Sequence, residues 1–507
     1  MMRRAWQRGE TEVCGGRAAV GLRSAVGGAP GHDDLRAPRI SAFARATLAA
    51  LGIALGACAG PPSREVVNGW REAAPLASAS DLDPAPRIVE VDLVAAPHRW
   101  MVGSRGAIDG FAYNGTIPGP LLEARVGDTL VVHFRNDLDE ATTIHWHGVR
   151  VPHEMDGAPH SQDPVPPGGT FEYRFVLEDA GTFWYHPHQN EPEQMERGLY
   201  GAIVVRADDE PTVDGEAVLV LDDLLLAADG TLAPFGGLLE VHGGREGDVQ
   251  LVNGVEAPVV PVRSGARLRW RIVNAGSARI YRLTLAGHRF TVLGSDGGAW
   301  SRPQVVDALV LAPGDRMDVV VDVMADPGAR VSLVAEEYER GHGQGVFAPV
   351  TVATLETSEA PPLEVLSPLE RTRTIEALDG EASPARTITF DERLDTTSGT
   401  LSFFVNGESY PDVTPVPARV GVTQVWDLVN MSEMTHPFHL HGFFFQVVER
   451  DGRPVSDRTW EDTIELVGME RVRIAFLPDD RPGMWMFHCH ILEHVHAGMM
   501  GMMELGR

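Results

Sequence analysis

Residues 127–136 have the sequence Gly-Asp-Thr-Leu-Val-Val-His-Phe-Arg-Asn, a short apolar run that opens on Gly and closes on Asn. Such runs, bounded by turn residues, are typical of β-strands. Two later runs repeat this outline, and an Asn-Gly pair precedes each of the three: the runs are 265–274 and 421–430, and the pairs are 114–115, 253–254 and 406–407. Three copies of one pattern predict three similar β-sandwich domains in an all-β chain.

The rest of the chain fits this organisation. Other short runs rich in β-branched residues, such as 317–322 and 472–476, are closed by turn residues, and amphipathic helices are scarce. We therefore predict a leader over 1–57, a tether over 58–85, sandwich domains over 86–208, 213–357 and 384–507, and an acidic, Pro-containing linker over 358–383.

The predicted leader ends in an apolar run, residues 46–57, which follows three arginines between residues 36 and 45. The run is too short to span a membrane but suits the apolar region of a signal peptide. It leads into Leu-Gly-Ala-Cys58, which resembles the lipobox of bacterial lipoproteins. We therefore predict export to the periplasm or outer membrane with a lipid anchor at Cys58. A plain signal peptide is the alternative, and the long leader suggests a start codon further downstream.

Charge and composition narrow the class of function. The 507 residues carry 71 Asp and Glu against 43 basic residues, a formal net charge of -28, and every basic residue is Arg because the sequence contains no Lys. The acid excess repels phosphate, which argues against nucleic acid as a partner. Without Lys, neither Schiff-base chemistry nor a P-loop is available. Three Cys against 19 His exclude a disulfide framework and point to metal.

Four histidine motifs fall in the first and third predicted domains. They are His145-Trp-His147-Gly, His186-Pro-His188, His436-Pro-Phe-His439-Leu-His441-Gly and His488-Cys489-His490-Ile-Leu-Glu-His494. On a strand, residues i and i+2 face the same side about 6.5–7 Å apart, so each His-x-His pair presents two imidazoles on one face. Eight imidazoles suit a cluster of metal ions, and imidazole binds Cu, Zn, Fe or Ni.

Cys489 discriminates among these metals. It lies between two cluster histidines, so its side chain points to the opposite face of the strand. With His436, His494 and Met499 it completes two imidazoles, one thiolate and a weak axial thioether, the ligand set of a blue-copper electron-transfer site. The backbone on either side of Cys489 then offers a short covalent path for an electron from this site to the cluster.

These motifs resemble the four copper-binding motifs of the multicopper oxidases, the family of laccases, bacterial copper-resistance oxidases and bilirubin oxidases. The resemblance spans nearly the whole mature chain and includes Phe111-Ala-Tyr-Asn-Gly-Thr-Ile-Pro-Gly-Pro120 and Leu311-Ala-Pro-Gly-Asp315. It implies three cupredoxin-like Greek-key domains, four copper ions, and oxidation of phenolic or aromatic-amine donors coupled to reduction of O2 to water. The implied partners are dioxygen and a small reducing substrate, and we expect a monomer.

The resemblance also implies a role for each ligand. Type 1 copper would be bound by His436, Cys489, His494 and Met499, type 2 copper by His145 and His439, one type 3 copper by His147, His186 and His490, and the other by His188, His441 and His488. When the repeats are aligned on their shared Asn, Ile280, Leu283 and Leu285 of the middle domain occupy the positions of His436, His439 and His441. That domain is therefore expected to bind no copper.

Reduction of oxygen to water consumes protons, so a carboxylate is needed beside the cluster. Asp156 matches the acidic residue of the family at this place, and a turn Asp before Gly157 is the alternative interpretation. Some bacterial relatives carry a further acid directly after the second type 1 His. This chain has Val495 there, which leaves Glu493 and Glu461 as candidates.

Other functions share parts of this pattern. A cuprous-ion oxidase for copper tolerance would use the same ligands. A soft Cu(I) surface is one interpretation of the methionines of the third domain, and core packing is the preferred one; these are Met469, Met484, Met486, Met500, Met502 and Met503. A copper-sequestering cupredoxin protein would be expected to have lost ligands, and none is missing. A nitrite-reductase-type enzyme would not need eight cluster imidazoles in one chain.

Overall fold

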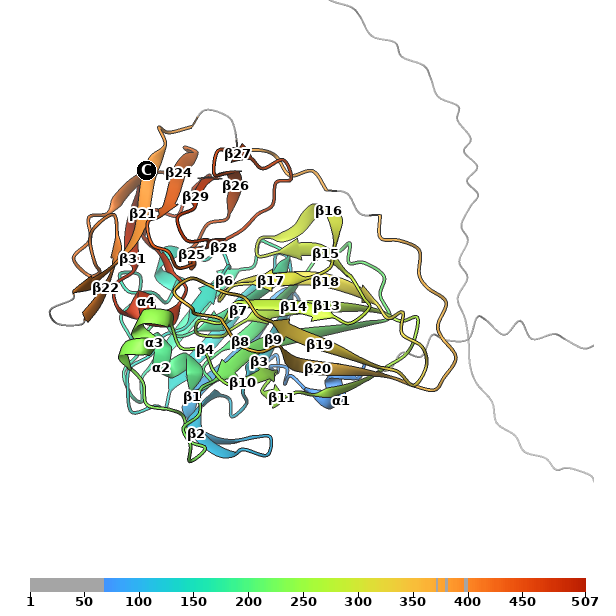
Figure 1. Cartoon of the computed structure of the whole chain (residues 1–507). Coiled ribbons are helices and arrows are strands. Elements are labelled where there is room, and N and C mark those ends of the chain that lie inside the picture. The colour runs from blue at the N-terminus through green and yellow to red at the C-terminus, as the bar shows by residue number, and fades with distance from the viewer. Residues whose placement is uncertain (1–67, 371–372, 379–381, 396–399) are drawn as a thin grey trace, which may run out of the picture. The chain divides into compact units, whose positions relative to one another are not determined.

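The computed structural model describes residues 68–370, 373–378, 382–395 and 400–507 (Figure 1). The predicted leader, the lipobox and Cys58 lie outside these residues. Within them the chain forms six β-sheets and a few short helices, which confirms the predicted all-β class. Among the described residues, no helix combines the length and apolar character that a membrane span requires.

The first two sheets lie within the first predicted domain and share a core. One has the strand order β2 (Gly106–Tyr113), β1 (Ile88–Val102), β4 (Thr129–Asn136) and β6 (Thr170–Val176); the other has β3 (Gly119–Arg125), β8 (Gly201–Arg206), β7 (Gly181–His186) and β5 (His145–His147). Val91 and Val132 of one sheet and Leu122 and Ile203 of the other belong to a single buried cluster. The two sheets therefore form a sandwich.

The next two sheets build a second sandwich around Trp270 and Leu283. The larger has the order β11 (Val255–Glu256), β10 (Val249–Val252), β9 (Gly215–Leu224), β13 (Arg267–Asn274), β18 (Arg316–Asp322), β15 (Phe290–Ser295) and β16 (Gly298–Val306). The smaller has β12 (Val259–Val262), β20 (Val350–Thr357), β19 (Arg330–Glu336), β14 (Tyr281–Leu285) and β17 (Leu309–Leu311).

The last two sheets pack together through Trp426 and Phe438. One has the order β22 (Thr400–Val405), β21 (Arg386–Asp395), β24 (Gln424–Asn430), β29 (Arg471–Phe476), β26 (Phe445–Arg450) and β27 (Arg453–Pro454). The other has β23 (Val416–Arg419), β31 (Met500–Gly506), β30 (Gly483–Cys489), β25 (His436–Leu440) and β28 (Thr463–Leu466). Among the described strands, each sheet takes its members from a single predicted domain; the exact domain boundaries stay predictions.

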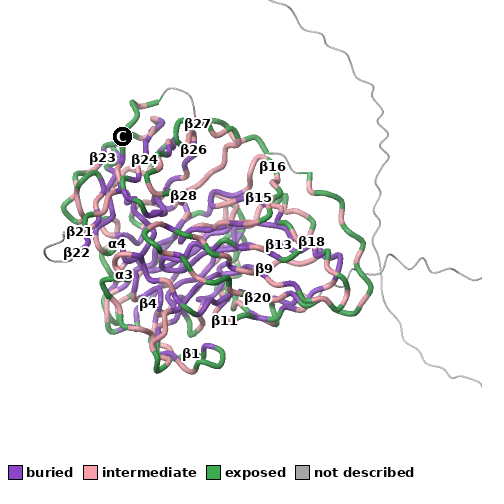
Figure 2. The backbone as a smooth tube through the Cα atoms, in the orientation of Figure 1, coloured by how far each residue is buried: buried purple, intermediate pink, exposed green. Residues whose placement is uncertain are grey.

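The helices are short and lie in the connections. They are α1 (Trp70–Ala73), η1 (His153–Met155), α2 (Glu191–Glu196), α3 (Leu238–Gly243) and α4 (Leu492–His496). Figure 2 shows that buried backbone follows the strands, while much of the exposed backbone lies in the connections between them. Residues 68–79 of the predicted tether are packed, because the buried indole of Trp70 meets Trp270 edge-on at 5.8 Å and Ala79 donates its N–H to the carbonyl of Leu121.

The repeated Asn makes the same contacts in all three sandwiches. Asn136, Asn274 and Asn430 are buried, and each donates from Nδ2 to backbone carbonyls of two separate segments of the chain. Each Oδ1 accepts the backbone N–H two residues further on, at 3.0 Å. A buried amide needs partners for its donors and its acceptor, so the repeat in the sequence has one structural cause.

Glu465 of β28 gives the fold a predicted pH dependence. Burial raises the pKa of this carboxyl from 4.5 to about 7, although the Tyr338 hydroxyl donates to it. Between about pH 4.5 and 7 the folded state therefore keeps a proton that the unfolded chain loses, and the free energy of unfolding falls as pH rises through this window. We expect Glu465→Gln, which mimics the protonated form, to flatten this fall in urea unfolding of the copper-free protein.

The matched control is Glu504→Gln, at an exposed position of β31. It is expected to keep the wild-type pH dependence. Equal slopes for both variants would contradict the assignment to Glu465.

Candidate metal centres

Two pairs of neighbouring strands bring the histidine motifs together. β5 pairs with β7 so that His145 lies opposite His186. β25 pairs with β30 so that His439 lies opposite His488. Because side chains alternate along a strand, the imidazoles of each pair face one side of their sheet.

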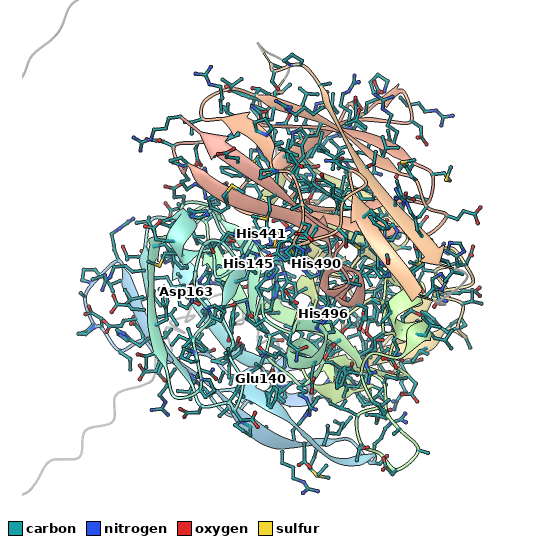
Figure 3. The ribbon with its side chains drawn as sticks, turned by 90° about the vertical axis from the view of Figure 1, so that its left-hand side faces the viewer. Glu140, His145, Asp163, His441, His490 and His496 are labelled. Carbon is teal, nitrogen blue, oxygen red and sulfur yellow. The ribbon has the colours of Figure 1, made fainter. Side chains whose placement is uncertain are left out.

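The eight predicted cluster imidazoles converge in one buried place, and Figure 3 shows His145, His441 and His490 close together there. Their nitrogens form three groups, within each of which the atoms lie no more than 4.8 Å apart: His145, His147 and His439; His147, His186 and His490; and His188, His441 and His488. The second and third groups contain the same residues as the two predicted type 3 sets. The first contains the predicted type 2 pair together with His147.

Hydrogen bonds on the far side of the rings fix their orientation. The Nδ1–H groups donate to oxygen atoms in five cases: His145 to Asp156 O (2.8 Å), His186 to Pro187 O (2.9 Å), His439 to Asp462 O (3.0 Å), His441 to Asp156 Oδ2 (2.8 Å) and His488 to Cys489 O (2.8 Å). His147 is turned the other way and donates from Nε2 to Asp462 Oδ1 at 3.1 Å. A ring that donates from one nitrogen in its neutral form presents a lone pair on the other, as metal-bound histidines do.

The inner nitrogens lack other partners. Nε2 of His145, Nδ1 of His147, and Nε2 of His186 and His439 are buried without a hydrogen bond among the described residues. Both ring nitrogens of His490 are unpartnered as well. Buried polar atoms are normally satisfied, so this gathering of unpartnered nitrogens indicates a site for cations.

The contact between His441 and His488 also indicates a site for a cation. Their Nε2 atoms lie 3.0 Å apart, yet both rings already donate from Nδ1. Burial holds the pKa of both imidazoles well below the ordinary value. Two lone pairs therefore face each other, and a metal ion between them would remove the repulsion.

Asp156 lies against the cluster, as predicted. Its carboxylate accepts from His441, and one oxygen lies 3.4 Å from Nδ1 of His145. Burial opposes its charge, but His441 and His145 outweigh burial and hold the pKa of this carboxyl well below its ordinary value. Asp156 also stands in a turn, which was the alternative interpretation. It directly follows η1 and precedes Gly157, whose φ is 74°.

Asp462, which was not predicted, contacts a different pair of cluster imidazoles, His147 and His439. Its carboxylate accepts from His147 and from the buried guanidinium of Arg316, whose Nη1 lies 2.7 Å from Oδ1. Burial would raise the pKa of Asp462, but Arg316 and the imidazole hydrogen bonds hold it well below the ordinary value. Since Arg316 belongs to the middle sandwich, that sandwich supports the cluster without supplying an imidazole.

Glu191 is a third carboxylate at the cluster that sequence reasoning missed. Its Oε1 lies 2.7 Å from Nδ1 of His188, and the two side chains are 9% and 1% exposed. The contact is local, three residues along the chain at the start of α2. This contact places a carboxylate beside His188, as Asp156 lies beside His441.

The predicted type 1 residues lie on the other face of β30. The Cys489 sulfur lies 3.6 Å from Nδ1 of His436 and 3.7 Å from Nδ1 of His494. Both rings make a hydrogen bond at Nε2, to the Ser432 hydroxyl at 2.8 Å and to the carbonyl of His242 at 3.1 Å. The Nδ1 atoms are 3.2 Å apart and face the sulfur, again with no room for two protons between them.

Burial changes the pKa values of the predicted type 1 ligands. It raises the pKa of the Cys489 thiol well above its ordinary value, so a thiolate here requires a cation beside it. Burial also lowers the pKa of His436 to about 3, with a contribution from Arg340, which keeps this imidazole neutral and available as a ligand. Met499 is buried next to these residues in the chain, and its carbonyl accepts the N–H of Cys489.

The remaining candidates lie elsewhere. Glu493 is buried and Glu461 half-buried, and burial raises the pKa of each to about 7, but Glu493 accepts from the backbone of Arg245 and Glu461 from Ser295. Val495 packs in an apolar cluster with three buried methionines, Met486, Met500 and Met502.

The other methionines divide between core and surface. Met503 is also buried, which confirms the preferred interpretation of core packing for four of the six methionines, whereas Met469 is 68% exposed. Ile280, Leu283 and Leu285, which the repeats align with the histidines of the third motif, are buried apolar residues of the middle sandwich.

The ligand chemistry of the two centres is that of a copper-dependent oxidoreductase. Comparison with protein families agrees, because multicopper oxidase models match residues 100–210, 184–360 and 382–506. The chain therefore belongs to the multicopper oxidase family, whose members are oxidoreductases that use O2.

The proteins similar to this chain include multicopper oxidases and laccases. Multicopper oxidase MmcO of Mycobacterium tuberculosis is 32% identical, covering 89% of this chain and 93% of that protein, and the laccase of Bacillus subtilis is 26% identical, covering 78% and 90%. Among solved structures, a Campylobacter jejuni multicopper oxidase described as a metallo-oxidase has a TM-score of 0.77 at 30% identity, covering 85% of this chain and 94% of its own.

A laccase-like enzyme of an Ochrobactrum species, described as active towards lignin model compounds, has a TM-score of 0.75 at 26% identity and covers 85% of this chain and 100% of its own. These structures confirm the predicted cupredoxin-like fold. Laccases and a metallo-oxidase both occur among the relatives, so membership of the family does not fix the donor.

Proposed function

We propose that the protein is an oxidase that holds four copper ions in one chain and couples one-electron oxidation of a small reducing substrate to four-electron reduction of O2 to water. The observation that carries the proposal is the convergence of unpartnered imidazole nitrogens in a buried site, beside a separate Cys and two His site. When bound, copper supplies the one-electron redox chemistry that protein side chains lack. Since each set of candidate ligands comes from a single chain, a monomer is sufficient.

Each ligand keeps the role that the resemblance implies. We assign His436, Cys489, His494 and Met499 to type 1 copper, His145 and His439 to type 2 copper, and His147, His186, His490, His188, His441 and His488 to the two type 3 coppers. Cys489 is the point of electron entry, because His488 and His490 are bonded to it along the backbone and face the cluster.

Asp156 is assigned to proton handling. Its pKa lies well below the ordinary value, so the carboxylate is ionised at neutral pH, and it accepts from His441 and orients that ring beside the cluster. Glu493 and Glu461 are engaged by Arg245 and Ser295 and are weaker candidates for this role.

Two classes of donor fit the proposed oxidase. From the sequence we expect phenols or aromatic amines, with Cu(I) as the alternative donor of a copper-tolerance enzyme. The Nε2–H of His494 donates to the carbonyl of His242 in α3, so this edge of the type 1 site is covered by the chain. This favours donors that bind at the surface of α3 over a phenol that contacts His494 directly.

We further propose that the protein is exported and held at the cell envelope by a lipid on Cys58. Only the sequence supports this proposal, through the apolar run and the small residues before Cys58. The mass of the mature N-terminal peptide tests it: a diacylated Cys58 is expected, and an unmodified N-terminus at another residue would contradict it.

Glu191 is predicted to strengthen copper binding at the His188 group. Loss of a carboxylate that orients a histidine ligand lowers metal affinity by about 10- to 100-fold. We therefore expect Glu191→Gln to release copper to a chelator at a lower chelator concentration than the wild type. Glu193→Gln, two residues on in α2, is the control, because Glu193 pairs with the half-buried Arg197 instead. Equal copper retention in the two variants would contradict the role of Glu191.

Oxygen consumption with a phenol, an aromatic amine and Cu(I) under equal conditions tests the proposed function. Consumption with at least one donor, at a stoichiometry of four electrons per O2 and without accumulation of peroxide, is expected. An absence of consumption in copper-loaded protein with all three donors would reject the oxidase and favour copper storage.

A further inference from the structure

We propose that His242, His342 and Glu392 bind an oxidisable first-row metal ion, Fe(II) in preference to Cu(I), as an electron donor for the type 1 site. The inference rests on the proposed function, because the electron must continue to the Cys489 centre.

The three side chains come from separate segments that meet beside the type 1 residues. His242 lies in α3, His342 in the loop after β19, and Glu392 in β21. The ring centres of His242 and His342 are 5.3 Å apart. This is close to the 5.1 Å between His436 and His494, which we assign to one copper ion. Nε2 of His342 lies 2.9 Å from Oε1 of Glu392, so the carboxylate adjoins the His342 ring of this pair.

Glu392 offers an oxygen that still needs a partner. Its side chain is only 10% exposed, and Oε2 is buried without a hydrogen bond among the described residues. Leaving a buried carboxylate oxygen unpartnered is costly, and a bound cation would satisfy it. The His342 side chain is 31% exposed, so an ion can arrive from solvent.

The loop that carries His342 is anchored to its surroundings. The buried guanidinium of Arg340 donates to the carbonyl of Gly243 at the end of α3 and to Glu246. The carbonyl of Arg340 accepts the N–H of Thr435, next to a type 1 ligand, at 2.6 Å. His342 itself has a φ of 53°, in the left-handed region that is uncommon for a residue other than glycine. The ring is therefore placed by a fixed local structure.

His242 connects this site to the type 1 centre. Its carbonyl accepts the Nε2–H of His494 at 3.1 Å. An electron released at the His242 ring has a path through the bonds of that one residue and a single hydrogen bond to His494. His494 faces the Cys489 sulfur with its other nitrogen.

The donor set favours Fe(II). Two imidazoles and a carboxylate with open positions form the set that binds non-haem Fe(II), whereas Cu(I) prefers soft sulfur ligands. The negative charge of Glu392 also favours the more highly charged, oxidised ion. The step balances: each Fe(II) loses one electron to become Fe(III), and four electrons with four protons reduce one O2 to two waters.

Co(II) is a suitable binding probe, because it accepts the same ligands and reports them by visible absorption. We expect the copper-loaded protein to bind one further Co(II) per chain. His342→Ala should remove this binding, and Glu392→Gln should weaken it by about 10- to 100-fold, as expected for loss of a charged partner at a metal site. Both variants should keep the blue absorption of the type 1 site, which shows that the fold is intact. His98→Ala, which alters a half-buried histidine of β1, is the matched control and should bind Co(II) as the wild type does.

Kinetics with Fe(II) complete the test. The KM for Fe(II), measured by oxygen consumption above the uncatalysed rate, should rise at least about tenfold in His342→Ala and stay unchanged in His98→Ala. Unaltered Co(II) binding in His342→Ala and Glu392→Gln would overturn the site, and a dependence of Cu(I) but not Fe(II) oxidation on these residues would overturn the choice of ion. Protein that holds four copper ions and consumes oxygen but has no Co(II) site would reject this inference alone. Failure to bind copper would reject the proposed function instead.

Discussion

Cys489→Ser is expected to abolish the blue absorption and to reduce donor oxidation by at least about 10³-fold, the scale of loss when an essential group is removed. The Cys489 sulfur is the only thiol among the described residues and lies 3.6 Å and 3.7 Å from the nitrogens of His436 and His494. A serine hydroxyl is too weak a ligand for the soft type 1 site. The imidazole cluster lies on the other face of β30. The variant should therefore keep the copper of the cluster and contain three copper ions per chain.

Absorption spectra, copper analysis and oxygen consumption of the purified variant measure these effects. Met486→Leu is the control on the same strand, because it conserves volume in the core and is expected to keep both the colour and the activity. Persistence of the blue band in Cys489→Ser, or loss of all copper, would contradict the assignment of two separate centres.

Asp462→Ala is expected to lower the free energy of unfolding of the copper-free protein by about 1–3 kcal/mol, because it leaves buried donors of a guanidinium without their acceptor. That guanidinium belongs to Arg316, which is fully buried and bonded to both oxygens of Asp462. A second buried carboxylate, Asp296, lies 3.2 Å from Nη1 of Arg316 and remains in the variant. The same substitution removes the acceptor of His147. We therefore also expect copper loss from the cluster, with the type 1 colour retained.

Urea unfolding and copper analysis check both expectations. Asp457→Ala breaks an exposed pair with Arg302, whose side chains are 42% and 65% exposed, and should cost less than about 1 kcal/mol. A similarly small loss of stability for Asp462→Ala would show that Asp296 alone compensates the charge of Arg316, and it would contradict the role of Asp462 in supporting the cluster.

The fold was predictable because its determinants repeat along the chain. The Gly-to-Asn spacing reports an amide that closes the same hydrogen bonds in three sandwiches, as Asn136 and Asn430 show. The clustering of the imidazoles was predictable because strand periodicity fixes the face of His145 relative to His147, and of Cys489 relative to its neighbours.

The carboxylates behind the ligands were only partly predictable. Asp156 was found through the family resemblance, whereas nothing in the local pattern around Asp462 distinguishes it from other acids before a strand. Its partner His147 is 315 residues away, and only the packing of two sheets brings them together. Glu191 did carry a signal, since it stands three residues after His188 at the start of a helical turn.

The proposed metal-ion site of His242, His342 and Glu392 was not predictable from the sequence, for a different reason. The link between His494 and α3 is made by the backbone carbonyl of His242, and a backbone contact leaves no mark on residue types. His242 and His342 also lack the i, i+2 spacing that made the cluster histidines recognisable, so as isolated residues they resembled ordinary surface histidines.

Copper content tests the central claim most directly. Protein reconstituted under anaerobic conditions, dialysed and then oxidised in air should contain four copper ions per chain, be blue, and show paramagnetic resonance from two of the four ions, because the type 3 pair is coupled. One or two ions per chain, or four without the blue band, would contradict the assignment of the imidazole cluster and the Cys489 site as the two centres of an oxidase.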